Sequence, residues 1–162
     1  MNKPNGRRIM GDSKDGKRNG EGFNTWYRED GTMEKQYTGG YNDGKKNGKG
    51  THTWYREDGT TIKQHYTGGY KDGKKNGKGT YTWYRSNGTT IKQQHTGQFK
   101  DGKYSGEGTC ILYHEDGTTI KQQYIGALKD NKPNGVGTYV WYSKDGTKTE
   151  ELTGQFVGIM HQ

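Results

Sequence analysis

The side chains that most often carry catalysis are few in this chain and form no repeated constellation. The five histidines stand at unrelated positions, and the single cysteine, Cys110, lies within a run of strand-forming residues. A nucleophile needs a base within hydrogen-bond reach, and the sequence pattern gives Cys110 no such partner. No spacing of His, Cys, Asp or Glu matches a metal site. We therefore predict no catalytic residue, metal ligand, cofactor or small-molecule substrate, and the sequence argues against an enzyme.

Glycine-rich turns are the next candidates, because such turns can cradle phosphate groups. The pattern Asp-Gly-Lys-x-Asn-Gly-x-Gly recurs at 43–50 and 72–79. Phosphate-binding loops of this kind lead into the N-terminus of a helix. Here strand-forming residues follow instead, so the pattern indicates β-turns that join strands.

Lysines gather in these turns and could attract an anionic surface. The net charge is +8 and the isoelectric point is near 9.4, which makes an anionic partner plausible. Near an anionic phospholipid surface each basic residue contributes about 1 kcal/mol. The residues predicted to do so are Lys45, Lys46, Lys49, Lys74, Lys75 and Lys78. Acidic turns, such as Glu57-Asp58, are expected at the opposite edge. The alternative is that edge lysines only prevent aggregation between sheets.

A repeat positions all of these residues. The residue before each lysine-rich turn recurs at intervals of 28 or 29, as Gly16, Gly44, Gly73, Gly102 and Asn131. A fixed period of this length is typical of stacked structural units. The hydrophobic fraction of 24% and mean hydropathy of −1.40 would otherwise suggest disorder. The regular placement of 13 Tyr and 4 Trp favours a folded array whose stability comes from contacts between neighbouring units.

Each repeat is expected to be a two-stranded hairpin. A run rich in Thr, Tyr and Trp, such as Thr80–Tyr84, ends at an Asx-Gly turn, and a return segment such as Thr89–Phe99 follows. The predicted fold is all-β: a single-layer antiparallel meander of repeated hairpins. It forms one repeat domain over residues 1–162, with about five hairpins and half-repeat caps at 1–16 and 147–162.

Alternation along the strands separates an aromatic face from a face rich in Thr, Lys and Gln. Tyr81 and Trp83 share one face, and Ile91, His95 and Phe99 share one face of the return strand. We expect the rings to lie over glycines of neighbouring strands. Because a single layer leaves this face uncovered, we also expect it to pack against another copy or a partner. The predicted partner-binding residues are Trp26, Trp54, Trp83, Trp141, Tyr37, Tyr41, Tyr66, Tyr70 and Phe99.

The pattern resembles the MORN (membrane occupation and recognition nexus) repeat family. The family motif appears as Tyr37-Thr38-Gly39-Gly40-Tyr41 with glycines at 44, 48 and 50, and it recurs over 66–79. Looser copies lie at 95–99 and 124–128. The repeats here are about six residues longer than is typical of the family, which lengthens the return strand. The Trp- and Tyr-rich wall-binding repeats share the composition but have a shorter period and lack this turn.

The resemblance implies a non-enzymatic scaffold that mediates protein–protein interaction, including self-association. Its alternative implication is peripheral binding to anionic phospholipid through the lysine-rich edge. Nucleic acid is disfavoured, because the aromatic residues and the basic turns lie on different parts of the sheet. An ice-binding lattice of Thr pairs is disfavoured too, because the pairs lapse at Cys110 and Val140. The lone cysteine and the absence of an apolar leader predict a cytoplasmic protein, peripheral at a membrane under the alternative.

Overall fold

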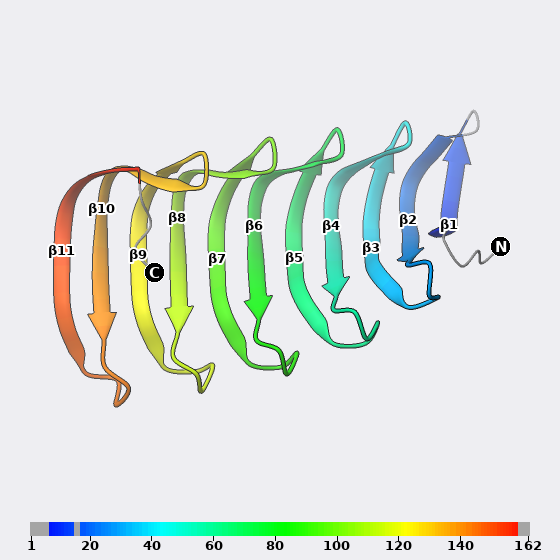
Figure 1. The fold of residues 1–162 in the computed structure, drawn as a ribbon. Helices are drawn as coiled ribbons and strands as arrows, with labels where there is room; N and C mark the ends of the chain where they lie inside the picture. Colours follow the sequence, from blue (N-terminus) through cyan, green and yellow to red (C-terminus); the bar gives the residue numbers. More distant parts are fainter. Residues whose placement is uncertain (1–6, 15–16, 159–162) are drawn as a thin grey trace.

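The protein is a single antiparallel sheet in which every strand pairs with its neighbours in the sequence (Figure 1). The computed structural model describes residues 7–14 and 17–158, with side chains from residue 19 onward. Within these ranges there are eleven strands and no helix. The strands are β1 (Arg7–Lys14), β2 (Lys17–Tyr27), β3 (Met33–Asn42), β4 (Lys45–Tyr55), β5 (Ile62–Lys71), β6 (Lys74–Tyr84), β7 (Ile91–Lys100), β8 (Lys103–Tyr113), β9 (Ile120–Lys129), β10 (Lys132–Tyr142) and β11 (Lys148–Val157). The predicted single-layer meander of hairpins is confirmed.

Two kinds of connection alternate along the array. Tight turns line one side of the sheet and longer loops line the other, at the top and bottom of Figure 1. In the turn between β5 and β6, Asp72 and Gly73 have φ of 51° and 85°, the left-handed conformation of a two-residue type I′ hairpin. In the loop between β4 and β5, Asp58 Oδ1 accepts the N–H groups of Thr60 and Thr61 at 2.9 and 2.8 Å. The sequence therefore specifies each connection locally.

The rings of one face lie over glycines, as predicted. Gly68 of β5 pairs with Gly50 on one side and Gly79 on the other, so three glycines meet across adjacent strands. The ring of Tyr66 fills the space that side chains would occupy: a Cβ built on Gly79 would lie 2.5 Å from the Tyr66 hydroxyl. That hydroxyl donates a hydrogen bond to the Gly69 carbonyl at 2.9 Å. Glycine thus lets a large ring lie flat on the backbone.

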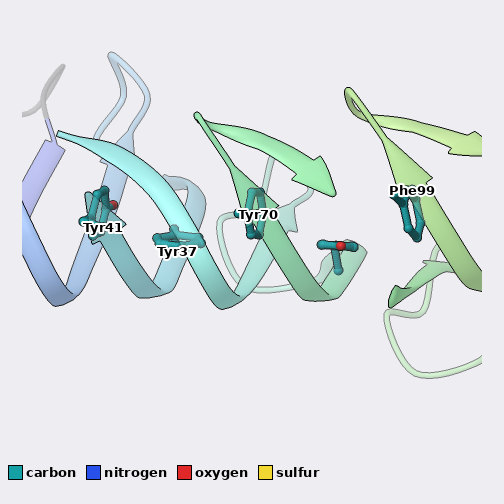
Figure 2. Packing of buried hydrophobic residues seen from close by; sticks show 5 residues of the cluster. Tyr37, Tyr41, Tyr70 and Phe99 are labelled. Atoms are coloured by element: carbon teal, nitrogen blue, oxygen red, sulfur yellow. The ribbon is translucent and has the colours of Figure 1, made fainter. Parts of the chain in front are cut away.

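The sheet buries a core without a second layer. Figure 2 shows Tyr37, Tyr41, Tyr70 and Phe99 in a row within the curve of the strands. Tyr37 and Tyr66 are 0% exposed, and each ring meets the next edge-to-face, as at 5.3 Å between Tyr37 and Tyr70. The first cluster comprises Tyr37, Tyr41, Tyr66, Tyr70 and Phe99. The second comprises Tyr124, Leu128 and Tyr139. Tyr104 packs against both.

A bulge corrects one expectation from strand alternation. Trp83 pairs with Gln93, but Tyr84 pairs with Ile91, so Lys92 is the extra residue. Ile91 therefore shares the face of Tyr84 rather than that of His95 and Phe99. The same irregularity recurs beside Trp26, Trp54 and Leu112. An extra residue reverses the alternation beyond it, which a strict period of two does not anticipate.

Hydrogen bonds join each hairpin to the next on both sides of the sheet. On the loop side, Arg28 donates from Nη2 to the Tyr55 carbonyl at 2.7 Å, and Arg56 and Arg85 make the same bond one repeat further on. His114 takes the arginine's place, with its Nε2 3.0 Å from the Tyr142 carbonyl. On the turn side, Gly73 N–H donates to the carbonyl of Lys46 at 2.9 Å. Consecutive repeats are therefore linked beyond their strand ladders.

The first and last strands lie within the segments predicted as half-repeat caps. β1 lies within the predicted cap 1–16, whose residues 1–6 and 15–16 lie outside the described part. β11 lies within the cap 147–162, of which 159–162 are likewise outside. The described residues contain no helix of the length and hydropathy needed to span a bilayer.

Candidate functional site

Parallel aromatic rings form a continuous row across β2, β4 and β6. Trp26 stacks on His52 at 5.9 Å, His52 on Trp54 at 3.8 Å, and Trp54 on Tyr81 at 5.9 Å. Tyr81 in turn stacks on Trp83 at 5.5 Å. The interplanar angles are between 8° and 18°. We call these five residues the aromatic row. The stacked rings form one layer on this face of the sheet, in which His52 is buried and the other four rings are partly buried.

The nine predicted aromatic residues fall into two groups. Tyr37, Tyr41, Tyr66, Tyr70 and Phe99 are at most 6% exposed and form the core within one chain. They need no second molecule to cover them, contrary to the expectation of an uncovered stripe. The four tryptophans, Trp26, Trp54, Trp83 and Trp141, are partly buried. A partner on this face would therefore contact tryptophan rings rather than the tyrosine core.

The six predicted lysines also divide. Lys45, Lys49, Lys74 and Lys78 are exposed along the turn side of the sheet. Lys46 and Lys75 instead lie over the aromatic face. The Lys46 Nζ is 5.3 Å from the centre of the Tyr37 ring and 5.5 Å from that of Trp26, and the Lys75 Nζ is 4.9 Å from that of Tyr81. Neighbouring residues point to opposite faces of a strand, which separates Lys45 from Lys46.

Burial weakens the positive charge of these two amines. Desolvation lowers the pKa of Lys46 to about 8, with further contributions from Lys35 and Lys75. Burial also lowers the pKa of Lys75. Beneath them, desolvation lowers the pKa of His52 to about 2, so that imidazole is neutral and acts as an aromatic spacer. An anionic group placed beside Lys46 and Lys75 would stabilise their charged form.

The residue at this covering position changes along the array. The second residue after the turn glycine or asparagine is a lysine in two repeats, Lys46 and Lys75. In the next two repeats this position holds Tyr104 and Pro133. Tyr104 stacks on His95 at 3.8 Å, and Pro133 is buried. Among residues 19–158, an amine at this position overlies stacked rings in the second and third repeats only, as Lys46 and Lys75.

The lowered pKa of Lys46 gives a testable titration. Below about pH 8 the folded chain holds this amine charged at a desolvation cost that the unfolded chain lacks. The unfolded chain binds more protons from there to about pH 10.4, so the free energy of unfolding rises with pH through this range. We expect Lys46→Met to lose that rise, as measured by urea unfolding at pH 7 and pH 9.5. An equal rise in wild type and variant would contradict the assignment; Lys45→Met, at an exposed site, is the control.

The single cysteine comes closest to a nucleophile–base pair. Its Sγ lies 3.0 Å from Nδ1 of His95. Burial raises the pKa of the Cys110 thiol to about 12 and lowers that of His95 to about 4. Both groups are therefore neutral near pH 7, and a neutral thiol is a poor nucleophile. The pair fills the place that tyrosines occupy in the flanking repeats.

Sequence reasoning missed the arginines that link the repeats. An arginine beside Glu-Asp in a turn resembles an ordinary solvated residue. The available signal was its recurrence at the first loop position, as Arg28, Arg56 and Arg85, together with the period of the repeat. Each arginine stands about one repeat before the backbone carbonyl to which its side chain donates a hydrogen bond.

Comparison with known proteins gives a family match over more than half of the chain. The MORN repeat matches five times, at residues 10–28, 37–58, 66–88, 95–113 and 124–146. These matches are in register with the hairpins: each begins within an odd-numbered strand and runs through the even-numbered strand that follows it. A search of curated proteins finds no match.

Proposed function

Because the chain belongs to the MORN-repeat family, we propose that it is a non-enzymatic scaffold that binds protein segments on its aromatic face. The aromatic row, overlain by Lys46 and Lys75, is the observation that carries this proposal. Its rings are held parallel by stacking, and two partly desolvated amines lie beside them. Tryptophan and tyrosine are enriched among the residues that contribute most to protein–protein affinity.

The chemistry of the site favours a particular kind of segment. Apolar or aromatic side chains would pack on Trp54 and Trp83, and carboxylates would pair with Lys46 and Lys75. Such pairing restores the charge that burial disfavours in these amines. A second copy of this chain is one source of such a segment, because acidic residues occur in its loops.

Peptide selection would test this proposal. A library displayed on phage and selected on the wild-type chain should yield acidic peptides with aromatic residues. We expect these peptides to bind Trp54→Ala/Trp83→Ala at least about tenfold more weakly, the loss of about 1.4 kcal/mol or more that removal of two central aromatic contacts implies. The control, Thr51→Ala/Thr80→Ala, alters the opposite face. Equal binding to both variants would reject the aromatic row as the site.

The exposed lysines favour a second candidate function, attachment to anionic phospholipid. Lys45, Lys49, Lys74 and Lys78 lie on one side of the sheet. Flotation with vesicles that contain acidic lipid would test it, because electrostatic attachment should be lost in 0.5 M salt and in a variant with these four lysines changed to glutamate. Absence of flotation at low salt would reject this candidate.

A further inference from the structure

A depression on the loop side of the sheet borders Trp83, the last residue of the aromatic row, and none of the lysines of the tight turns lines it. It has a volume of about 620 Å³, and its walls include Arg56, Lys63, Arg85, Ser86 and Lys92. These residues come from two successive loops and from the bulges that follow them. The turn side with Lys45 and Lys74 lies at the other end of the strands (Figure 1).

The charges around this depression are unbalanced. Arg56, Lys63, Arg85 and Lys92 supply four positive charges, and Glu115 is the one acidic residue among those that line it. Sequence reasoning placed the acidic turns on this edge and expected a negative character. The structure instead brings arginines and bulge lysines together there, since each arginine reaches toward the next repeat.

The third loop along the chain, between β6 and β7, lacks the acidic pair that the second loop (β4 to β5) and the fourth loop (β8 to β9) carry. Ser86-Asn87 stands where the second loop has Glu57-Asp58 and the fourth has Glu115-Asp116. Asn87 nevertheless builds the same loop: its Oδ1 accepts the N–H groups of Thr89 and Thr90 at 3.0 and 2.8 Å. The exchange thus removes two negative charges and preserves the hydrogen bonds that shape the loop.

The preceding loop provides an internal comparison. A similar depression of about 570 Å³ is lined there by Arg28, Arg56 and Lys63, but also by Glu57 and Asp58. Hydrogen bonds from Thr61 and Thr60 lower the pKa of Asp58 to about 2, so this carboxylate is ionised near pH 7. Three basic residues face two acidic ones at this site, which leaves little excess positive charge for an anion.

The guanidinium groups at the third loop are already oriented. Arg56 donates from Nη2 to the Tyr84 carbonyl at 2.8 Å, and Arg85 donates from Nη2 to the Tyr113 carbonyl at 2.9 Å. Over residues 19–158 these are the only side-chain hydrogen bonds found for the two arginines, which leaves the Nη1 donors available. Oriented guanidinium groups bind oxyanions with little further loss of conformational freedom.

We propose that this depression binds a phosphate monoester. An excess of three positive charges and two oriented guanidinium groups matches a dianion with three acceptor oxygens better than a single carboxylate. A soluble ester is favoured over a lipid headgroup, because a flat membrane on the lysine-rich turn side would not reach the loop side. Ser86 adds a hydroxyl donor at the rim.

Titration of the full chain with O-phosphoserine, followed by amide NMR in 0.15 M NaCl, tests the proposal. We expect saturable shifts confined to residues around 56–63 and 85–92. The double variant Ser86→Glu/Asn87→Asp restores the loop sequence of the neighbouring repeats and should keep its fold, checked by its melting temperature. Its affinity for O-phosphoserine should fall at least about tenfold, since two negative charges return to the rim.

The reverse exchange serves as the matched control. Glu57→Ser/Asp58→Asn should create a second but weaker site at the preceding loop, with shifts around 28–35 and 56–63, because the Arg28 Nη1 already donates to the carbonyls of Met33 and Arg56. Equal affinity of wild type and Ser86→Glu/Asn87→Asp would overturn the proposal. So would the absence of saturable shifts at 20 mM O-phosphoserine, or binding seen only with vesicles that carry a phosphomonoester lipid.

Discussion

Replacing Gly68 with alanine is expected to lower the free energy of unfolding by about 3 kcal/mol or more. A Cβ at this position would lie 2.5 Å from the Gly79 Cα and 2.6 Å from the Lys78 carbonyl oxygen. Both are backbone atoms of the adjacent strand, so β5 and β6 would have to separate. Gly68 also has φ of 156°, a conformation that side chains disfavour. Overpacking and backbone strain each cost about 1–3 kcal/mol. Urea unfolding followed by tryptophan fluorescence measures the loss.

The chain contains its own control for this substitution. Gly154 of β11 occupies the equivalent place in the last copy of the motif, and a Cβ there would have no atom within 4 Å. The described residues place no strand on the outer side of β11. Gly154→Ala should therefore leave the free energy of unfolding within about 0.5 kcal/mol of wild type. Equal losses at both positions would show that close approach of strands is not the reason for the glycine.

Replacing Tyr66 with alanine is expected to cost about 3–5 kcal/mol, as for other large buried aromatic residues. The ring is 0% exposed and meets Tyr70 and Phe99 edge-to-face at 5.2 and 5.1 Å. It also covers Gly79. A cavity there would remove contacts on three strands at once. Because repeats contact only their neighbours, we expect the third repeat to lose hydrogen-exchange protection before the first.

Tyr66→Phe separates the ring from its hydroxyl. The phenylalanine keeps the packing but leaves the Gly69 carbonyl without the hydrogen bond from Tyr66. We expect a loss of about 1 kcal/mol, in the range of a single hydrogen bond. If Tyr66→Phe cost as much as Tyr66→Ala, the hydroxyl rather than the ring would hold the strands together.

The sequence was sufficient to predict the hairpin meander and the rings over glycine. Both depend on local rules that repeat: Asx-Gly at each turn, alternation along each strand, and a glycine paired with a glycine. A glycine stands at the offset of Gly68 in each copy from 37 onward, and the offset of Tyr66 holds a tyrosine in three of these copies, His95 in one and Leu152 in the last, so one register explains all of them. The MORN motif is defined by glycines and aromatic residues at these same offsets.

Features that depend on three-dimensional reach were not predictable in the same way. Lys45 and Lys46 look alike in the sequence, and the strand pleat directs only Lys46 onto the rings. Arg56 looks solvated until its partner carbonyl in the next hairpin is known. Ile91 was assigned to the wrong face because the bulge at Lys92 reverses the alternation.

The meeting of the two aromatic clusters at Tyr104 has a consequence for how the array comes apart. Among residues 19–158, Tyr104 is the ring that packs against both clusters, on the strand where Cys110 and Leu112 stand at the positions of Tyr81 and Trp83. Each half of the array therefore has its own cluster of buried rings, and Tyr104 joins the two while the strand ladder continues through β8 on both sides. If the sheet opened locally near β8, each half would keep its own packed rings.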